Sequence, residues 1–193
     1  MFAQRMAFAA VGLLMAIPAA HANYIANGGF ETGDLTGWTA AGSFIGVHTA
    51  GFNGFNPNSG TYFAGLGTTN GNGSLSQTIA DTPGQTLQLD YYLAADGGTP
   101  SYFEADWNGS AIIGSAMSNT AASGYIEHTF SLVSTGSDVL TFLERNDPGY
   151  WAFDDISLNL ADTQRVPEPM TLSLFGAGLI GLAWALRRRS KKA

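Results

Sequence analysis

The chain contains no cysteine among its 193 residues. Thiol catalysis, thiolate metal sites and disulfide bonds are therefore excluded. Without such cross-links, the stability of a folded domain must come from its hydrophobic core, alone or together with a bound cation.

Basic side chains are nearly absent from the middle of the chain. Between Asn23 and Asp162 there are 14 Asp and Glu residues and a single basic residue, Arg145, so this segment carries a charge of −13, against −7 for the whole chain. A strongly acidic surface repels phosphate backbones but is compatible with divalent cations. We therefore expect no nucleic-acid partner.

The composition is not that of a protein with long surface helices, because glycine is abundant, at 25 residues, while Lys and Arg total 8. Such a composition is typical of short strands joined by tight turns, and the length allows one domain plus terminal extensions. Leu87, Leu89 and Tyr91 alternate with Gln88 and Asp90, as expected for a strand with one buried face.

Eight strand-like runs, several of them with clear alternation, lie between turns rich in Gly, Pro and Asn. They predict strands at 43–49, 61–66, 74–79, 86–94, 101–108, 125–133, 138–145 and 150–160. We interpret residues 23–162 as one all-β domain, a two-sheet antiparallel β-sandwich of the jelly-roll type.

Residues 1–22 have the pattern of a secretory signal. Arg5 is followed by an apolar stretch from Met6 to Ile17 and by Ala20-His21-Ala22, a small-x-small cleavage pattern. This predicts an N-terminal signal helix and a mature chain that begins at Asn23. The alternative is a retained membrane anchor or a short buried helix.

The other end contains an uncharged apolar run from Met170 to Leu186. As a helix it spans roughly 25 Å, slightly less than a hydrocarbon core of about 30 Å, and modest thinning of the bilayer accommodates the difference. Five basic residues follow within the next six positions, which favours leaving this end in the cytoplasm. We therefore predict a transmembrane helix at 170–186, with the acidic domain outside.

Residues 163–193 as a whole resemble the PEP-CTERM sorting signal. The matching features, in order, are Val166, Pro167, Glu168 and Pro169, the glycine-bearing helix, and the basic cluster of Arg187, Arg188 and Arg189. The resemblance implies an exopolysaccharide-producing Gram-negative host and recognition by an exosortase-type membrane protease, with cleavage near the Pro-Glu-Pro. The alternative is an ordinary C-terminal anchor in the inner membrane, to which the same orientation argument applies.

The central domain resembles galactose-binding-like carbohydrate-binding modules with a jelly-roll fold. The matching segments are Asn27-Gly28-Gly29-Phe30-Glu31, Gly37-Trp38, Asn58-Ser59-Gly60-Thr61-Tyr62, Leu75-Ser76-Gln77-Thr78-Ile79 and Trp151-Ala152-Phe153-Asp154-Asp155-Ile156-Ser157-Leu158. Since this fold carries many functions, the resemblance predicts the architecture more directly than the activity.

The resemblance also implies that the first and last strand regions lie together and hold a structural Ca²⁺. Carried over, Asp154 supplies a carboxylate ligand, Gly29 and Gly60 supply carbonyl oxygens, and Glu31 a further carboxylate, all of which are the oxygen ligands that Ca²⁺ takes. The alternative is that Asp154 and its neighbour Asp155 are solvated or cap a turn.

Sugar binding relies on aromatic faces that stack on pyranose rings beside polar groups. Trp107 and Tyr102 are the aromatic residues that we assign to a glycan site, while Trp38 is expected to pack beneath the first loop. The glycan expected from the sorting system is exopolysaccharide.

No arrangement of catalytic residues is apparent. Glu104 and Asp106 sit two positions apart on one predicted strand, and alternating acidic residues on a solvated face explain them. His48 and His128 are isolated, without metal-ligand spacing, and the chain has no Gly-x-Ser-x-Gly motif. We predict that the protein is not an enzyme.

Together these features predict an exported protein, held in the inner membrane by its C-terminal helix and then sorted to the cell surface or the extracellular matrix, where it contacts exopolysaccharide. The alternative function is that of a structural surface protein without a ligand.

Overall fold

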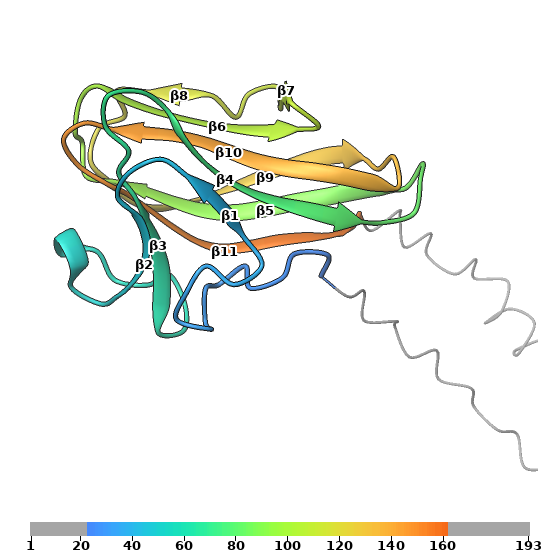
Figure 1. The fold of residues 1–193 in the computed structure, drawn as a ribbon, viewed down its shortest axis with the longest axis horizontal. Coiled ribbons are helices and arrows are strands. Elements are labelled where there is room, and N and C mark those ends of the chain that lie inside the picture. Colours follow the sequence, from blue (N-terminus) through green and yellow to red (C-terminus); the bar gives the residue numbers. More distant parts are fainter. Residues whose placement is uncertain (1–22, 162–193) are drawn as a thin grey trace, which may run out of the picture.

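The computed structural model describes residues 23–161, which form two antiparallel sheets packed face to face as a β-sandwich (Figure 1). The predicted all-β class is confirmed. The predicted signal helix at 1–22, the transmembrane helix at 170–186 and the sorting motif lie outside the described residues. No helix within residues 23–161 has the length and apolarity needed to cross a bilayer.

Each sheet is built mainly from strands distant in sequence. The first sheet has the order β1-β4-β10-β6-β7, with β8 also paired to β6, and the second has the order β2-β3-β11-β5-β9. The bounds of the first sheet are β1 Thr39–Ala41, β4 Gly73–Ala80, β6 Ser101–Trp107, β7 Ser110–Ala111, β8 Met117–Ser118 and β10 Ser137–Asn146. Those of the second are β2 Ile45–Thr49, β3 Tyr62–Leu66, β5 Thr86–Ala95, β9 Ser123–Val133 and β11 Trp151–Leu160, and a 3-10 turn, η1, spans Phe52–Gly54.

All eight predicted runs form strands, with ends shifted by at most two residues. Leu87, Leu89 and Tyr91 point inward and are fully buried, as their alternation predicted. The predictions missed β1, β7 and β8, because strands of two or three residues are too short to show a period.

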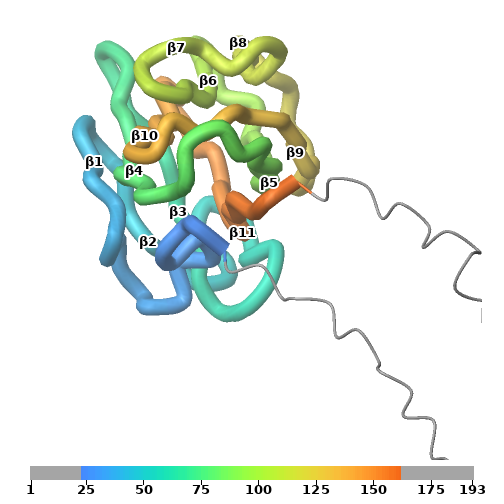
Figure 2. The backbone as a smooth tube through the Cα atoms, turned by 90° about the vertical axis from the view of Figure 1, so that its right-hand side faces the viewer, coloured from blue at the N-terminus to red at the C-terminus, as the bar shows by residue number. Residues whose placement is uncertain are grey.

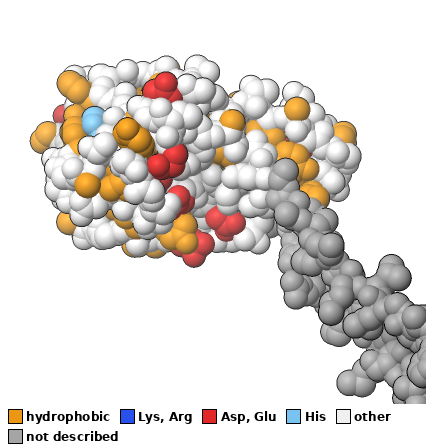
Figure 3. Space-filling view, turned by 90° about the horizontal axis from the view of Figure 1, so that it is seen from below, with side chains coloured by type: hydrophobic (Ala, Val, Ile, Leu, Met, Phe, Trp, Pro, Cys, Tyr) orange, Lys and Arg blue, Asp and Glu red, His pale blue; other side chains and the backbone are white. Residues whose placement is uncertain are grey.

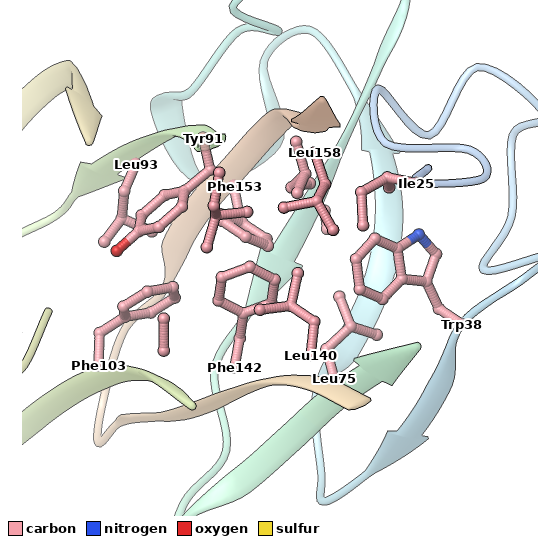
Figure 4. Packing of buried hydrophobic residues seen from close by; sticks show 14 of the residues in the cluster. Ile25, Trp38, Leu75, Tyr91, Leu93, Phe103, Leu140, Phe142, Phe153 and Leu158 are labelled. Atoms are coloured by element: carbon pink, nitrogen blue, oxygen red, sulfur yellow. The ribbon is translucent and has the colours of Figure 1, made fainter. Parts of the chain in front are cut away.

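Aromatic side chains from both sheets fill the core (Figure 4). Tyr91 and Phe153 come from the second sheet and meet Phe103 and Phe142 from the first. Phe142 and Phe153 pack edge to face, with ring centroids 4.6 Å apart at an interplanar angle of 66°. Such contacts join the two layers and add about 1 kcal/mol each beyond the burial of area.

The segment before β1 packs against the last strand. The Tyr24 N–H donates to the Leu158 carbonyl at 2.8 Å, and the Ile156 N–H donates to the Gly28 carbonyl at 3.0 Å. Trp38 lies beneath this segment, 8% exposed, and its indole N–H donates to the Asn27 carbonyl at 3.1 Å. These contacts bring the first and last parts of the domain together, and both described ends emerge at one end of the sandwich (Figures 1 and 2).

Candidate functional site

The first candidate site surrounds Asp154, at an irregularity in β11. The register of β11 with β5 shifts between Asp154 and Ser157, and Asp155 takes a positive φ of 51° at this bulge. Asp154 is fully buried; its Oδ2 accepts the Asn58 N–H at 2.8 Å and its Oδ1 accepts the Asp155 N–H at 2.8 Å. Burial, reinforced by the charge of Asp155, raises the pKa of Asp154 to about 7.

The loop before β3 connects this carboxylate to the first segment of the domain. The Asp155 carboxylate accepts hydrogen bonds from the Asn58 side-chain amide at 2.8 Å and from the Ser59 hydroxyl at 2.7 Å. Glu31 Oε1 accepts the N–H groups of Thr61 and Tyr62 at 2.9 and 3.0 Å. One short loop is thus bound by carboxylates from both ends of the domain.

The two glycines assigned to the metal site lie beside these carboxylates. A Cβ added at Gly29 would lie 3.4 Å from Asp155 Oδ1 and 3.9 Å from Asp154 Oδ1, and one added at Gly60 would overlap the Glu31 carboxylate. The structure therefore brings Asp154, Glu31, Gly29 and Gly60 together, although they span more than half of the chain.

Three acidic side chains and no basic one from residues 23–161 lie at this junction. Glu31, Asp154 and Asp155 supply carboxylate oxygens, and Arg145, the single Lys or Arg of residues 23–161, forms its ion pair elsewhere, with Asp147. The face of the molecule in Figure 3 carries a band of acidic side chains and shows no Lys or Arg. Within the described residues no three His, Cys, Asp or Glu side chains form a ready ligand cluster, so a cation would also need carbonyl oxygens, as Ca²⁺ readily takes.

The second candidate site is a cleft of about 450 Å³ between edge strands of the two sheets. Trp107, at the end of β6, lies on one side, and β9, the edge strand of the second sheet, lies on the other. The lining residues are Trp107, Ser110, Ala111, Ile112, Ile113, Thr129, Phe130, Ser131 and Leu132.

The indole of Trp107 is held in a fixed orientation in this cleft. Its Nε1 donates to the Val133 carbonyl at 3.1 Å, which also links β6 to the end of β9. Aromatic and aliphatic groups thus stand beside the hydroxyls of Ser110 and Ser131, a combination that suits the apolar face and hydroxyl rim of a sugar ring.

Tyr102, the other residue assigned to glycan binding, does not line this cleft. Along β6 the buried residues are Ser101, Phe103 and Ala105, so Tyr102 faces away from the core, whereas Trp107 has the parity of the buried residues. A hydrogen bond to Glu104 raises the pKa of the Tyr102 hydroxyl to about 12. The two aromatic residues therefore belong to different surfaces.

Glu104 and Asp106 share the outward face of β6 with Tyr102. Burial, followed by the charge of Glu104 and a hydrogen bond with it, raises the pKa of Asp106. The positions of Glu104 and Asp106, two residues apart on the outward face, match the predicted alternation of acidic residues along this strand.

The histidines pack against aromatic rings. His48 stacks on Phe52 with centroids 3.4 Å apart, and His128 stacks on Tyr91 at 5.1 Å. Partial burial lowers the pKa of both histidines, which favours the neutral ring in these stacks.

Most of the cleft lining could not be predicted from the sequence. Ser110 lies in a strand of two residues that has no pattern of its own, and Phe130 lies in a long strand whose pattern does not indicate a cleft. The one local signal was Trp107 at the end of a predicted strand, directly before Asn108-Gly109.

The fold is similar to that of carbohydrate-binding modules with a jelly-roll sandwich. TmCBM61, solved in complex with β-1,4-galactotriose, is similar with a TM-score of 0.56 and 21% identity over 72% of this chain and 99% of that one. The CBM22-1 xylan-binding domain of Paenibacillus barcinonensis Xyn10C is similar with a TM-score of 0.52 and 14% identity, over 75% of this chain and 98% of that one. The enzymatically active domain of bacteriophage CBA120 tailspike protein 4 is similar with a TM-score of 0.54 and 16% identity, over 72% of this chain but only 21% of that one. These similarities establish the architecture.

A second comparison concerns the C-terminal segment. Residues 165–189 match the PEP-CTERM protein-sorting motif, which implies exosortase-dependent export and a membrane-anchored sorting signal at this end. The predicted resemblance to that signal is confirmed. No curated protein matches the chain.

Proposed function

We propose that the protein is an exported, non-catalytic glycan-binding protein, sorted by an exosortase-type system to the cell surface or extracellular matrix, where it contacts exopolysaccharide. The observation that carries this proposal is the Trp107 cleft, which presents an oriented aromatic face and hydroxyl groups on a carbohydrate-binding-module fold. The sorting motif supplies the route to the surface.

The test is Trp107→Ala in the full chain, purified in non-ionic detergent and titrated with the host exopolysaccharide, with β-1,4-galactotriose and with xylan, the last two being named for two structural neighbours. We expect saturable binding by the wild type and a loss of about three- to tenfold in the variant, since a stacked aromatic ring contributes about 0.5–1.5 kcal/mol beyond its burial.

Tyr102→Ala is the matched control, because this tyrosine lies on the same strand but on the opposite face. It should retain wild-type binding. Loss of binding in Tyr102→Ala alone would move the site to the outer face of the first sheet, and the absence of saturable binding to any glycan would favour a structural surface protein without a ligand.

We also propose that Asp154, Glu31 and the carbonyls of Gly29 and Gly60 hold a structural Ca²⁺. The support is a fully buried carboxylate with a raised pKa, in a group of oxygens without a neighbouring basic side chain. A bound divalent cation would stabilise the ionised form of Asp154 and join the first segment to β11.

The test of this calcium site is titration with CaCl₂. Calorimetry should show heat of binding, and the melting temperature should rise; both effects should be lost in Asp154→Ala. No change in either quantity for the wild type would contradict the proposal.

A further inference from the structure

The Trp107 cleft has no charged side chain in its lining. Its residues are aromatic, aliphatic or hydroxyl-bearing, so every polar group that it offers is neutral. Recognition of an anionic sugar in proteins ordinarily uses Arg or Lys to pair with the carboxylate. The cleft provides no such group.

Carboxylates lie immediately behind the lining. Thr129, in the wall formed by β9, donates its hydroxyl hydrogen to Asp90 at 2.7 Å. Asn108, which follows Trp107, donates its side-chain amide to Asp138 at 2.5 Å. Burial opposes ionisation of Asp138, but hydrogen bonds from Asn108 and Thr135 outweigh it and lower the pKa to about 2, so this carboxylate is charged at neutral pH.

No basic side chain among residues 23–161 offsets this field near the cleft. Arg145 is the single Lys or Arg of the described part, and it pairs with Asp147, which follows the far end of β10. In the antiparallel pairing of β10 with β6, Arg145 lies opposite Tyr102 at the start of β6, while Trp107 lies opposite Leu140 at its end. The arginine and the cleft are thus at opposite ends of the same strand pair.

We infer that the Trp107 cleft selects uncharged glycan segments and discriminates against uronate-containing ones. This inference rests on the proposed glycan-binding function and names the substrate class of that site. Neutral pyranose units stack and hydrogen-bond without an electrostatic penalty, whereas each carboxylate on a uronate chain enters a negative field without a partner.

The test uses one polymer in two charge states. Polygalacturonate and its carboxyl-reduced product, a neutral galactan of the same linkage, are titrated against the full chain in non-ionic detergent with EDTA present, which removes bridging by divalent cations. We expect the reduced polymer to bind at least about ten times more tightly at roughly 20 mM NaCl, and the gap to narrow at about 500 mM, where charges are screened over a few ångströms.

A matched pair of charge variants locates the discrimination. Ser110 and Ser118 are both exposed serines in two-residue strands paired with β6, but Ser110 lines the cleft and Ser118 does not. Ser110→Lys should reduce the preference for the neutral polymer severalfold, while Ser118→Lys, with the same net charge, should leave the preference close to wild type.

Equal or tighter binding of polygalacturonate by the wild type at low salt would overturn this inference while leaving the glycan-binding function in place. Equal effects of the two lysine variants would also overturn it, since they would show that net charge rather than the cleft decides. If neither polymer, nor any other glycan, binds saturably, the proposed function fails and the inference with it.

Discussion

At the scale of single residues, Asp154 combines complete burial with a position beside a second carboxylate. Its pKa is about 7 in the folded chain, above the value of a solvated aspartate, so the folded state retains a proton that the unfolded state releases between about pH 4 and 7. The stability that this group contributes without metal is therefore complete below about pH 4 and is lost as the pH rises through 7.

We predict that, in EDTA, the free energy of unfolding decreases between pH 5 and pH 8, with a contribution from Asp154 of up to about 3 kcal/mol, since about two pKa units of the shift fall in this window at about 1.4 kcal/mol each. Asp154→Asn should flatten this decrease, and saturating Ca²⁺ should abolish it in the wild type. Thermal unfolding across the pH range measures both effects. Asp34→Asn, a substitution at an exposed aspartate, should not reduce the slope; a wild-type melting temperature that rises from pH 5 to 8 in EDTA would contradict the assignment.

At the scale of elements, the attachment of the first segment to β11 depends on a close approach of two backbones. A Cβ at Gly28 would overlap the Ile156 carbonyl oxygen, which is backbone and has no rotamer through which to move away. The same contact region contains the hydrogen bond from the Ile156 N–H to the Gly28 carbonyl. Glycine is needed here for space, because neither residue of the contact can be displaced without losing this bond.

Gly28→Ala is accordingly expected to destabilise the domain by about 3 kcal/mol, at the upper end of ordinary overpacking effects. Chemical denaturation measures the change. Gly124→Ala is the control, because this glycine lies in β9 with no atom within 4 Å of an added Cβ, and it should change stability by less than about 1 kcal/mol. Similar losses in the two variants would show that the backbone contact is not the cause.

At the scale of the whole molecule, the secretory-signal pattern at residues 1–22 and the sorting motif at residues 165–189 together predict processing at both ends. Mass spectrometry of the protein from its host should find a mature N-terminus at Asn23 and surface material without the Arg187–Ala193 peptide. Replacing Pro167, Glu168 and Pro169 by alanine should leave an uncut chain in the inner-membrane fraction. An intact basic tail in surface-exposed wild-type material would contradict processing, and a soluble cytosolic protein with both ends uncut would contradict export.

The local sequence pattern was sufficient to predict the fold class and the positions of the long strands. Strand-like runs bounded by turn residues located all eight long strands, and in several of them period-two alternation also indicated which side chains face the core. The pattern did not show which segments pack against one another. Glu31 and Asp154, for example, lie close together only because the segment before β1 packs on β11. The resemblance of short motifs, rather than any spacing, suggested this proximity.

The sequence by itself determined the all-β class, the absence of thiol chemistry, the acidic charge of the domain and the sorting motif, since each depends on composition or on residues adjacent in the chain. Only the tertiary structure decided that Trp107 closes a cleft against β9 and that Tyr102 takes no part in it. The physical reason is that a cleft between two sheets arises from long-range pairing and stacking, which position strands far apart in the chain and leave no periodic trace within any one of them.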